Sequence, residues 1–332
     1  GDDDGGDDDT APDPCDDAAA LHVATTGADS GNCGAVGDPC QTIKHALGLI
    51  SGGGAVCVHA GTYAATWIEV PDDTWLYSAD GPQQAVIDSG VYSAVRFTDI
   101  SGAGIDGFEV HGDWAQGDPG DGLVRVYDAS QITIRDCVIH DAPNDQDCIK
   151  VSGQVSELLI EGVVAWNPGP RTGGDCDPPP CYQEVIDIFG SGAQQGDPPP
   201  VSDVTVRGCW LLHQGDVGDW LIYSKINVEN ILYENNIFGG SAGMGWGNAA
   251  VGIGTGEAGI PDATASVATH AIVRNNVFVG CKGDAAFAVM NAEDTWIYGN
   301  TFWNNGGPDL RSVIMFRGNS HDLGPVYLYD NV

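Results

Sequence analysis

Apolar and polar residues alternate with a period of two in short runs along most of the chain, as in Val204-Thr205-Val206 and Tyr327-Leu328-Tyr329. Such alternation predicts β-strands. The runs belong to a phrase that recurs eight times between Ala103 and Val332, and each phrase carries one residue at a matching place, which we call the column residue. The column residues are Phe108, Cys137, Val163, Cys209, Asn236, Asn276, Asn300 and Asn331. Intervals of 29, 26, 46, 27, 40, 24 and 31 residues separate them, which indicates stacked structural repeats.

A second strand is expected before each phrase after the first. These strands are Gly122–Tyr127, Cys148–Ser152, Glu184–Phe189, Leu221–Ile226, Ala250–Ile253, Ala285–Met290 and Val313–Arg317. No helical pattern of useful length fits between the phrases. Two or three short strands per turn of roughly 25 residues predict an all-β solenoid, a parallel β-helix whose coils stack about 4.8 Å apart. The late Asn column residues should then lie one above another, bonded to the backbone and to the Asn of the next coil.

The two ends of the chain differ from the repeats. Residues 1–20 hold nine Asp and no basic residue, and we expect them to form a disordered acidic linker to one β-helix domain at 21–332. An N-terminal cap is predicted over about 21–65, with strands at His22-Val23-Ala24 and Gly54–His59 and a short amphipathic helix at Gln41–Ile50. The helix should cover the open end of the first coil. The chain stops inside a phrase at Val332, so we expect either that it continues further or that the last coil pairs end to end with another copy.

The net charge restricts which kinds of molecule this protein can bind, and the cysteine content indicates the cellular compartment in which it resides. With 47 Asp and Glu against 12 Lys and Arg, a nucleic-acid partner is excluded, because phosphate binding needs clustered basic residues. No apolar run of about 18 residues is present, so we expect no transmembrane segment. Ten Cys favour an oxidising compartment, either extracellular or the bacterial cell surface, with disulfide candidates Cys33/Cys40 (or Cys40/Cys57) and Cys176/Cys181. Gly1-Asp2-Asp3-Asp4 resembles bacterial lipoprotein linkers, which leaves a lipid anchor open as an alternative.

Long repeat intervals and scarce cations indicate where a functional site should lie. The intervals of 46 and 40 residues contain insertions at Asn167–Cys181, Gly196–Pro200 and Gly254–Ala268, and insertions of this kind often build a binding cleft. Three of the few basic residues fall at outward positions of the second strands, with an acidic residue at the matching place of an intervening coil. They form a predicted column of Arg125, Lys150, Asp187 and Lys225. Such a column is a candidate track for an acidic polysaccharide.

The chemistry that such a track could support is β-elimination from a uronic acid. A base must remove the proton α to the carboxylate, and a cation must neutralise the charge that develops. We predict Lys225 as the base and Lys150 as the second catalytic cation, since neighbouring cations can lower the pKa of a lysine. The predicted substrate contacts are Arg125, Arg171, Asp187 and Tyr223. Ca²⁺, which takes six to eight oxygen ligands, is the expected cofactor. Its candidate ligands are Asp145, Asp147, Glu184, Asp216 and Asp219.

Two stretches carry family resemblances. Residues 21–332 resemble secreted right-handed β-helix proteins of the pectin-lyase type. Ser224-Lys225, with Glu229-Asn230 and Asn236-Ile237-Phe238 after it, resembles the catalytic coil of the chondroitinase B and alginate lyase family. A Lys on the corresponding strand supplies the base in that family, so the resemblance implies this role for Lys225. The next strand of the family carries Arg-His-Gly, whereas this chain has Val251-Gly252-Ile253-Gly254, so the second cation is either missing or comes from elsewhere, with Lys150 as the candidate.

Three alternatives stay open at this stage. Asp147-Cys148-Ile149-Lys150 resembles a polygalacturonase strand, and Asp147 with Asp187 could serve as the two carboxylates of a glycoside hydrolase. The chain could instead be a non-catalytic surface β-helix that binds glycan or associates with itself, since this fold supports many functions. Lys150 and Lys225 could also simply neutralise the carboxylates around them.

Overall fold

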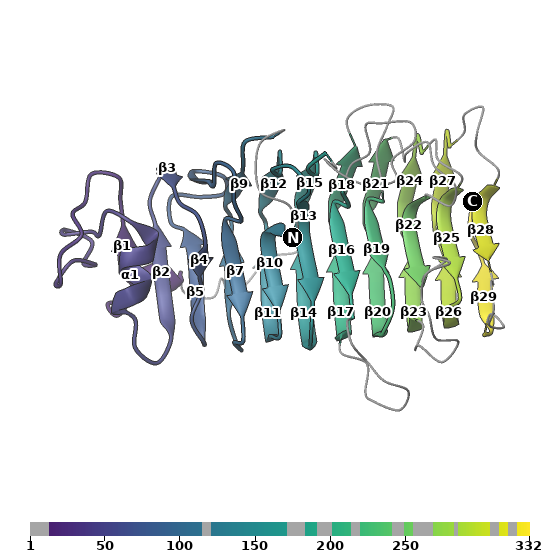
Figure 1. Ribbon diagram of the computed structural model, residues 1–332, viewed down its shortest axis with the longest axis horizontal. Helices are drawn as coiled ribbons and strands as arrows, with labels where there is room; N and C mark the ends of the chain where they lie inside the picture. Colours follow the sequence, from purple (N-terminus) through teal and green to yellow (C-terminus); the bar gives the residue numbers. More distant parts are fainter. Residues whose placement is uncertain are drawn as a thin grey trace, which may run out of the picture.

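The computed structural model is a rod of stacked parallel coils (Figure 1). It describes residues 13–114, 121–170, 183–190, 201–213, 220–240, 249–254, 268–281, 285–305, 312–317 and 324–332. The strands form three parallel sheets that run the length of the rod, which we call sheets A, B and C. The predicted parallel β-helix is thereby confirmed.

Sheet A has eleven strands and the other two sheets have nine each. The strands of sheet A are β1 (Leu21–Val23), β2 (Gly54–Val58), β5 (Thr74–Ser78), β8 (Gly104–Asp106), β11 (Ser130–Arg135), β14 (Val155–Glu161), β17 (Val201–Arg207), β20 (Val228–Glu234), β23 (Thr269–Arg274), β26 (Glu293–Tyr298) and β29 (Val326–Tyr329). Sheet B consists of β4 (Ile68–Glu69), β7 (Val95–Thr98), β10 (Gly122–Tyr127), β13 (Asp147–Ser152), β16 (Ile186–Phe189), β19 (Ile222–Ser224), β22 (Ala249–Gly254), β25 (Ala285–Met290) and β28 (Ser312–Arg317). Sheet C consists of β3 (Gly61–Ala64), β6 (Ala85–Asp88), β9 (Glu109–His111), β12 (Val138–His140), β15 (Val164–Trp166), β18 (Trp210–His213), β21 (Ile237–Gly240), β24 (Val277–Val279) and β27 (Thr301–Trp303).

Each coil runs through sheet B, then sheet A, then sheet C, so each repeated phrase is two strands joined by a sharp bend. The bend is made by the residue before the column residue, which has a positive φ in all eight phrases. These bend residues are Gly107, Asp136, Gly162, Gly208, Asn235, Asn275, Gly299 and Asp330. Gly, Asn and Asp are the residues that adopt this left-handed conformation most readily. This requirement explains why Gly, Asp and Asn recur just before the column residue.

Side chains that alternate inward fill the rod with Val, Ile, Leu, Phe and Ala. The predicted asparagine ladder is present at the bend between sheets A and C. The Asn276 Oδ1 accepts from the backbone N–H of Asn236 at 2.9 Å and from its Nδ2 at 3.0 Å. Asn300 accepts in the same way from Asn276 at 3.0 Å and 3.0 Å, and Asn331 from Asn300. The ladder therefore satisfies buried polar groups that a bend inside an apolar core would otherwise leave unpaired.

The N-terminal cap contains helix α1 (Ile43–Leu49), which packs against β1, β2 and β4 at the purple end of the rod (Figure 1). Thr42 caps the helix by accepting from the backbone N–H of His45 at 3.2 Å. Its buried residues, among them Ile43 and Leu47, cover the first coil. Within the described ranges, no helix has the length and hydrophobicity needed to cross a bilayer.

Two disulfides tie the cap together, and one of them changes the expected pairing. Cys33 pairs with Cys40 as the first alternative predicted, whereas Cys57 pairs with Cys15 and not with Cys40. Cys15 lies in η1 (Pro14–Asp16), so the segment 13–20 is attached to β2 and the ordered chain begins before residue 21. Proximity in sequence favoured Cys40 for Cys57, but η1 places Cys15 beside the strand. Cys176 and Cys181, and residues 1–12 of the expected linker, lie outside the described residues.

The cap should be sensitive to acid because of His22, which is 4% exposed. Its Nδ1 lies 3.1 Å from the Nε2 of His59, and burial together with His59 lowers the pKa of His22 below its usual 6.5. The unfolded chain then binds more protons than the folded one, so the free energy of unfolding should fall as the pH drops below about 6.5. Urea unfolding at pH 7 and pH 5 should show a smaller loss in H22Q than in the wild type. Equal losses would contradict the prediction, and H270Q, at an exposed histidine, serves as the control.

Candidate functional site

The outward side chains of sheet B form a grid because the strands are parallel and in register. The middle row follows the Cα pairing from coil to coil and reads Glu69, Arg96, Arg125, Lys150, Asp187, Tyr223, Gly252, Ala288 and Met315. The row is charged as far as Asp187 and uncharged from Tyr223 onward. Neighbouring members are about 4.8 Å apart along the rod. The outer face of sheet B therefore has a charged half and an apolar half that meet between β16 and β19.

A cluster of five charged side chains lies at this boundary, and we call it the charge cluster. Lys150 Nζ lies 2.9 Å from Asp147 Oδ2 and 2.8 Å from Asp187 Oδ2. Lys225 Nζ lies 3.0 Å from Glu184 Oε1 and 3.0 Å from Asp187 Oδ1. Asp187 thus joins the two lysines, and the cluster connects β13, β16 and the residue that follows β19.

Burial and mutual charge decide the protonation of the cluster. The three carboxylates are buried, while the side chains of Lys150 and Lys225 keep exposures of 27% and 20%. Burial raises the pKa of the Asp147 carboxyl well above its usual range, against the opposing effect of Lys150. Burial would lower the pKa of both lysines, but the adjacent carboxylates raise it. Both lysines are therefore ammonium ions at neutral pH in this arrangement.

The carboxylates of the charge cluster also form a set of oxygen donors. One oxygen each from Asp147, Glu184 and Asp187 lies within 4.8 Å of the other two, and hard cations such as Ca²⁺ prefer ligands of this kind. When all three carboxyl groups are ionised, their charge exceeds that of the two ammonium groups by one. The donor set fits Ca²⁺ chemically, provided that a lysine turns away from the oxygens it now holds. The partial exposure of both lysine side chains leaves room for that movement.

The sequence-predicted residues are only partly brought together. Asp187, expected as a substrate contact, lies among the carboxylates, whereas Asp145 is not part of that group. Arg125 is in register with Lys150 and binds Asp121 at 3.0 Å, with its guanidinium 4.7 Å from the centre of the Tyr127 ring. Arg171, Asp216 and Asp219 lie outside the described residues, as does most of the three predicted insertions.

Lys225 does not lie in the predicted column behind Arg125, Lys150 and Asp187. Tyr223, and not Lys225, pairs with Asp187 across the coils. Lys225 comes two residues after Tyr223, directly after the end of β19, and its side chain reaches back to Glu184 and Asp187. Its Nζ also lies 5.2 Å from the centre of the Tyr223 ring. The long, flexible lysine side chain thus joins the cluster although its backbone position is offset.

Sequence reasoning missed the apolar half of sheet B. Trp220 stacks on Tyr223 with ring centroids 4.3 Å apart, and both rings pack over Gly252, where a Cβ would lie 2.6 Å from the Trp220 ring. The outward neighbours beyond them are small or flexible residues: Ala249, Ala285, Ala288, Met290 and Met315. The run of Ala and Gly in β22 and β25 is the signal that could have revealed this surface. Trp220 and Tyr223 are only 5% and 4% exposed, so this apolar half is a buried packing layer beside the charge cluster.

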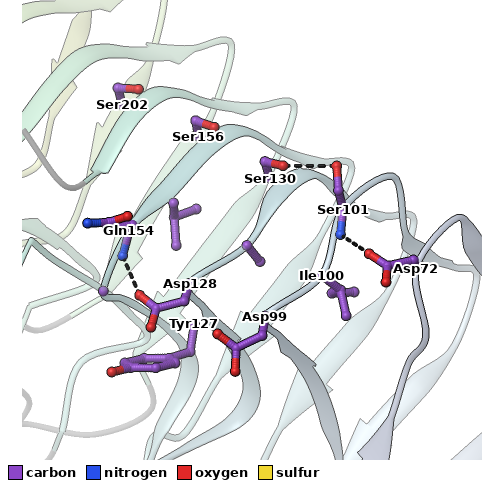
Figure 2. Close-up of a pocket in the computed structure, with 13 residues that line it drawn as sticks. Asp72, Asp99, Ile100, Ser101, Tyr127, Asp128, Ser130, Gln154, Ser156 and Ser202 are labelled. Atoms are coloured by element: carbon purple, nitrogen blue, oxygen red, sulfur yellow. Dashed lines mark hydrogen bonds between the residues drawn. The ribbon is translucent and has the colours of Figure 1, made fainter.

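A separate groove of about 920 Å³ runs along the turns between sheets B and A (Figure 2). One wall is a row of serines, with Ser101 and Ser130 joined by a 2.9 Å hydrogen bond and Ser156 and Ser202 continuing the row. The opposite wall carries Tyr127 and acidic side chains, and Asp72, Asp99 and Asp128 are the charged residues that line the groove. Since no basic residue is among the lining residues, the groove would repel a polyanion. The outer face of sheet B differs in carrying Arg96, Arg125, Lys150 and Lys225, each of them paired with an acidic residue.

No family model matches the sequence, and no curated protein matches it either. Solved structures do match the fold. The crystal structure of pectate lyase Pel9A aligns with a TM-score of 0.58 at 14% identity, over 94% of this chain and 79% of that one. An alginate lyase from Paenibacillus sp. str. FPU-7 aligns with a TM-score of 0.50 at 13% identity, over 94% of this chain and 98% of that one. The chain is therefore similar to these proteins in fold, and its fold is the right-handed parallel β-helix.

Proposed function

We propose that this protein is a carbohydrate-active β-helix protein that binds an acidic polysaccharide along the outer face of sheet B and cleaves it by β-elimination at the charge cluster. The observation that carries the proposal is the cluster itself. Buried ion pairs contribute little net stability, so three buried carboxylates and two lysines on the outside of an apolar solenoid are better explained by function than by folding. Two lyases with the same fold support the class of reaction.

The proposed reaction assigns one task to each lysine. Lys225, as the free amine, takes the proton α to the uronate carboxylate, and the electron pair forms a C=C bond as the bond to the glycosidic oxygen breaks. The leaving oxygen then needs a proton, which the Lys225 ammonium can return. Lys150 remains an ammonium ion and stabilises the negative charge that develops on the uronate. Tyr223 is 4% exposed and stacks on Trp220, and its ring centre lies 5.2 Å from Lys225 Nζ, so it would hold the Lys225 side chain in place and offer little surface to a sugar ring.

The raised pKa of Lys225 sets a condition on this mechanism. An ammonium ion cannot accept a proton, so the carboxylates that hold it must first be neutralised. Asp147, Glu184 and Asp187 are the residues that would hold Ca²⁺, and bound Ca²⁺ would supply positive charge that neutralises the carboxylates and lowers the pKa of Lys225. Activity should therefore depend on a divalent cation even though the lysines are the reacting groups.

Two other functions make different use of the same residues. A non-catalytic glycan-binding protein is favoured by the ion pairs of Lys225, because a permanently protonated lysine binds anions without reacting. The hydrolase alternative is disfavoured by distance. Oxygens of Asp147 and Asp187 lie within 4.8 Å of each other, and Lys150 bridges the two residues, whereas an inverting hydrolase keeps its carboxyl groups about 6.5–9.5 Å apart to admit a water.

The deciding experiment follows the ultraviolet absorbance of the unsaturated product. The protein is incubated with polygalacturonate, alginate or chondroitin sulfate in the presence of Ca²⁺. Growth of absorbance with one of the three supports elimination. Binding without absorbance, measured by affinity electrophoresis, would assign the protein to the non-catalytic class. New reducing ends without absorbance would indicate a hydrolase.

Chelation and one conservative substitution test the cation. We expect EDTA to abolish the absorbance signal and added Ca²⁺ to restore it. D147N removes one ligand charge without changing shape, so it should weaken Ca²⁺ binding in a calorimetric titration by about 10-fold or more. The control is D106N. Asp106 lies on sheet A and pairs with Arg135, away from the charge cluster, so this variant should leave Ca²⁺ binding unchanged. Full activity in EDTA would rule out the cation requirement.

A further inference from the structure

An exposed tryptophan lies on the same face of sheet B, far from the charge cluster. Trp67 directly precedes β4 and is 47% exposed. Its backbone N–H donates to the carbonyl of Ser93 at 2.8 Å, so its main chain is fixed to the next coil although its ring faces solvent. A single exposed tryptophan is ordinary, but Trp67 adjoins Tyr92, which is 37% exposed, so the two rings form a joint apolar patch.

The backbone of Trp67 is strained. Its φ is +51°, and the other non-glycine residues with positive φ in the described ranges are all Asp, Asn, Gln, Glu or His. A bulky aromatic residue in this region is a genuine outlier, and such strain concentrates at ligand contacts. An Asn or Gly at position 67 would remove the strain. Trp67 is 47% exposed, so the strained backbone at this residue is not needed to fill the core of the rod.

The surroundings of Trp67 hold its ring as a rigid platform. Tyr92, which is 37% exposed, meets the ring edge-on with centroids 5.4 Å apart. The Arg96 guanidinium lies 5.4 Å from the centre of the Trp67 ring and is held by Asp121 at 2.7 Å and Glu69 at 3.3 Å. The polarised C–H groups of a sugar ring pack well on the electron-rich face of such a ring. The platform thus combines two exposed aromatic rings with a guanidinium that lies over the Trp67 ring and is itself paired with two carboxylates.

The platform and the charge cluster lie on one line. The middle row of sheet B leads from Glu69 and Arg96 through Arg125 to Lys150 and Asp187, one residue per coil. Five coil steps separate β4 from β19, so Trp67 lies roughly 24 Å along the rod from Lys225. A disaccharide or trisaccharide cannot reach across this distance, but an extended polysaccharide can.

We infer that Trp67, Tyr92 and Arg96 form a distal aromatic subsite, which binds one sugar ring of a polysaccharide whose reacting unit lies at the charge cluster. The inference rests on the proposed placement of the substrate on sheet B. It adds that the chain runs along the rod axis from Lys225 toward α1 and that the ligand is a polymer, not a short oligosaccharide. Trp67 is then a binding residue without a part in the chemistry.

The test compares long and short ligands in W67N. Since Asn accepts the positive φ, W67N should unfold at the same temperature as the wild type or higher, which separates loss of binding from loss of fold. Affinity electrophoresis in polygalacturonate, alginate and chondroitin sulfate should show that W67N weakens binding of the polymer by roughly 2- to 10-fold. Binding of the trisaccharide of the same sugar should not change. W210A removes a comparably exposed tryptophan from sheet C and should leave both affinities unchanged.

The outcomes separate this subsite from the elimination chemistry. Trp67-dependent binding of a polymer without an unsaturated product would support the subsite and reject elimination. Elimination with equal polymer affinity in W67N and wild type would reject the subsite and support the chemistry. Equal weakening of the trisaccharide in W67N, or binding of none of the three polymers by the wild type, would overturn the inference.

Discussion

Substitution of Lys225 by alanine is expected to lower the rate of β-elimination by about 100- to 10,000-fold, the contribution that a positioned general base makes. The substitution removes the group that takes the proton, and it leaves Glu184 and Asp187 with one ammonium partner fewer. The rate is measured from the absorbance of the unsaturated product at saturating polysaccharide. R207A removes a cation from sheet A that is paired with Glu161 at 2.7 Å, and it should retain the wild-type rate.

A second substitution separates the base from the charge. Lys225→Arg keeps a cation beside Glu184 and Asp187, so the cluster should stay folded, but a guanidinium does not give up its proton near neutral pH. We expect K225R to bind the polysaccharide and to be as inactive as K225A. If K225R keeps the wild-type rate, Lys225 contributes charge alone and another residue is the base. Thermal unfolding of both variants shows whether a lost rate reflects a lost fold.

Substitution of Asn276 by alanine is expected to lower the free energy of unfolding by about 3 kcal/mol or more, because each buried polar group left unpaired costs about 1–3 kcal/mol. The variant leaves the backbone N–H of Asn236 without its acceptor and the carbonyl of Tyr233 without its donor, both at 2.9 Å in the folded protein. The midpoint of urea unfolding, followed by circular dichroism, measures the loss. N32A, at an exposed asparagine of the cap, should shift the midpoint little.

The asparagine ladder links each coil to the next through side-chain hydrogen bonds. Asn236, Asn276, Asn300 and Asn331 bond in series, so N276A also removes one of the two donors to the Asn300 Oδ1 and leaves only the backbone N–H of residue 276. The coils on either side should therefore lose protection of their backbone amides against hydrogen exchange, while the cap with α1 should not. A uniform loss of protection over the whole rod would contradict this expectation, because it would show that all coils unfold together and not only those next to Asn276.

The fold could be predicted because its signals are local and repeated. A period of two, a left-handed Gly, Asn or Asp at each bend and, in the last four phrases, an interior Asn after it all follow from the geometry of a single coil, and stacking repeats them. The Cys15–Cys57 disulfide could not be predicted in this way. It joins a segment outside the repeats to β2, and only the path of η1 brings the two sulfur atoms together.

The candidate site could be predicted in its composition but not in its arrangement. Scarcity of cations in a chain of net charge −35 drew attention to Lys150 and Lys225, and the alternation correctly placed Lys150 on the outer face beside Asp187. The pattern did not show that Lys225 is offset by two residues from the row and that its side chain bends back. The register between coils and the direction in which a long side chain bends are three-dimensional properties. The insertions inside the 46- and 40-residue intervals also make it hard to align one coil with the next from the sequence alone.

The amino-acid order alone is enough to specify a parallel β-helix with a helical cap and an asparagine ladder, because each coil meets only its neighbours and the same local rule applies at every turn. It also predicts that nucleic acid is not a partner, since only 12 of the residues are Lys or Arg against 47 Asp and Glu. The meeting of Asp147, Glu184 and Asp187 within 4.8 Å, and the alignment of Trp67 with that cluster along one face, were decided by the tertiary structure. These contacts join residues from different coils, and the stacking register that brings them together is a property of the assembled rod.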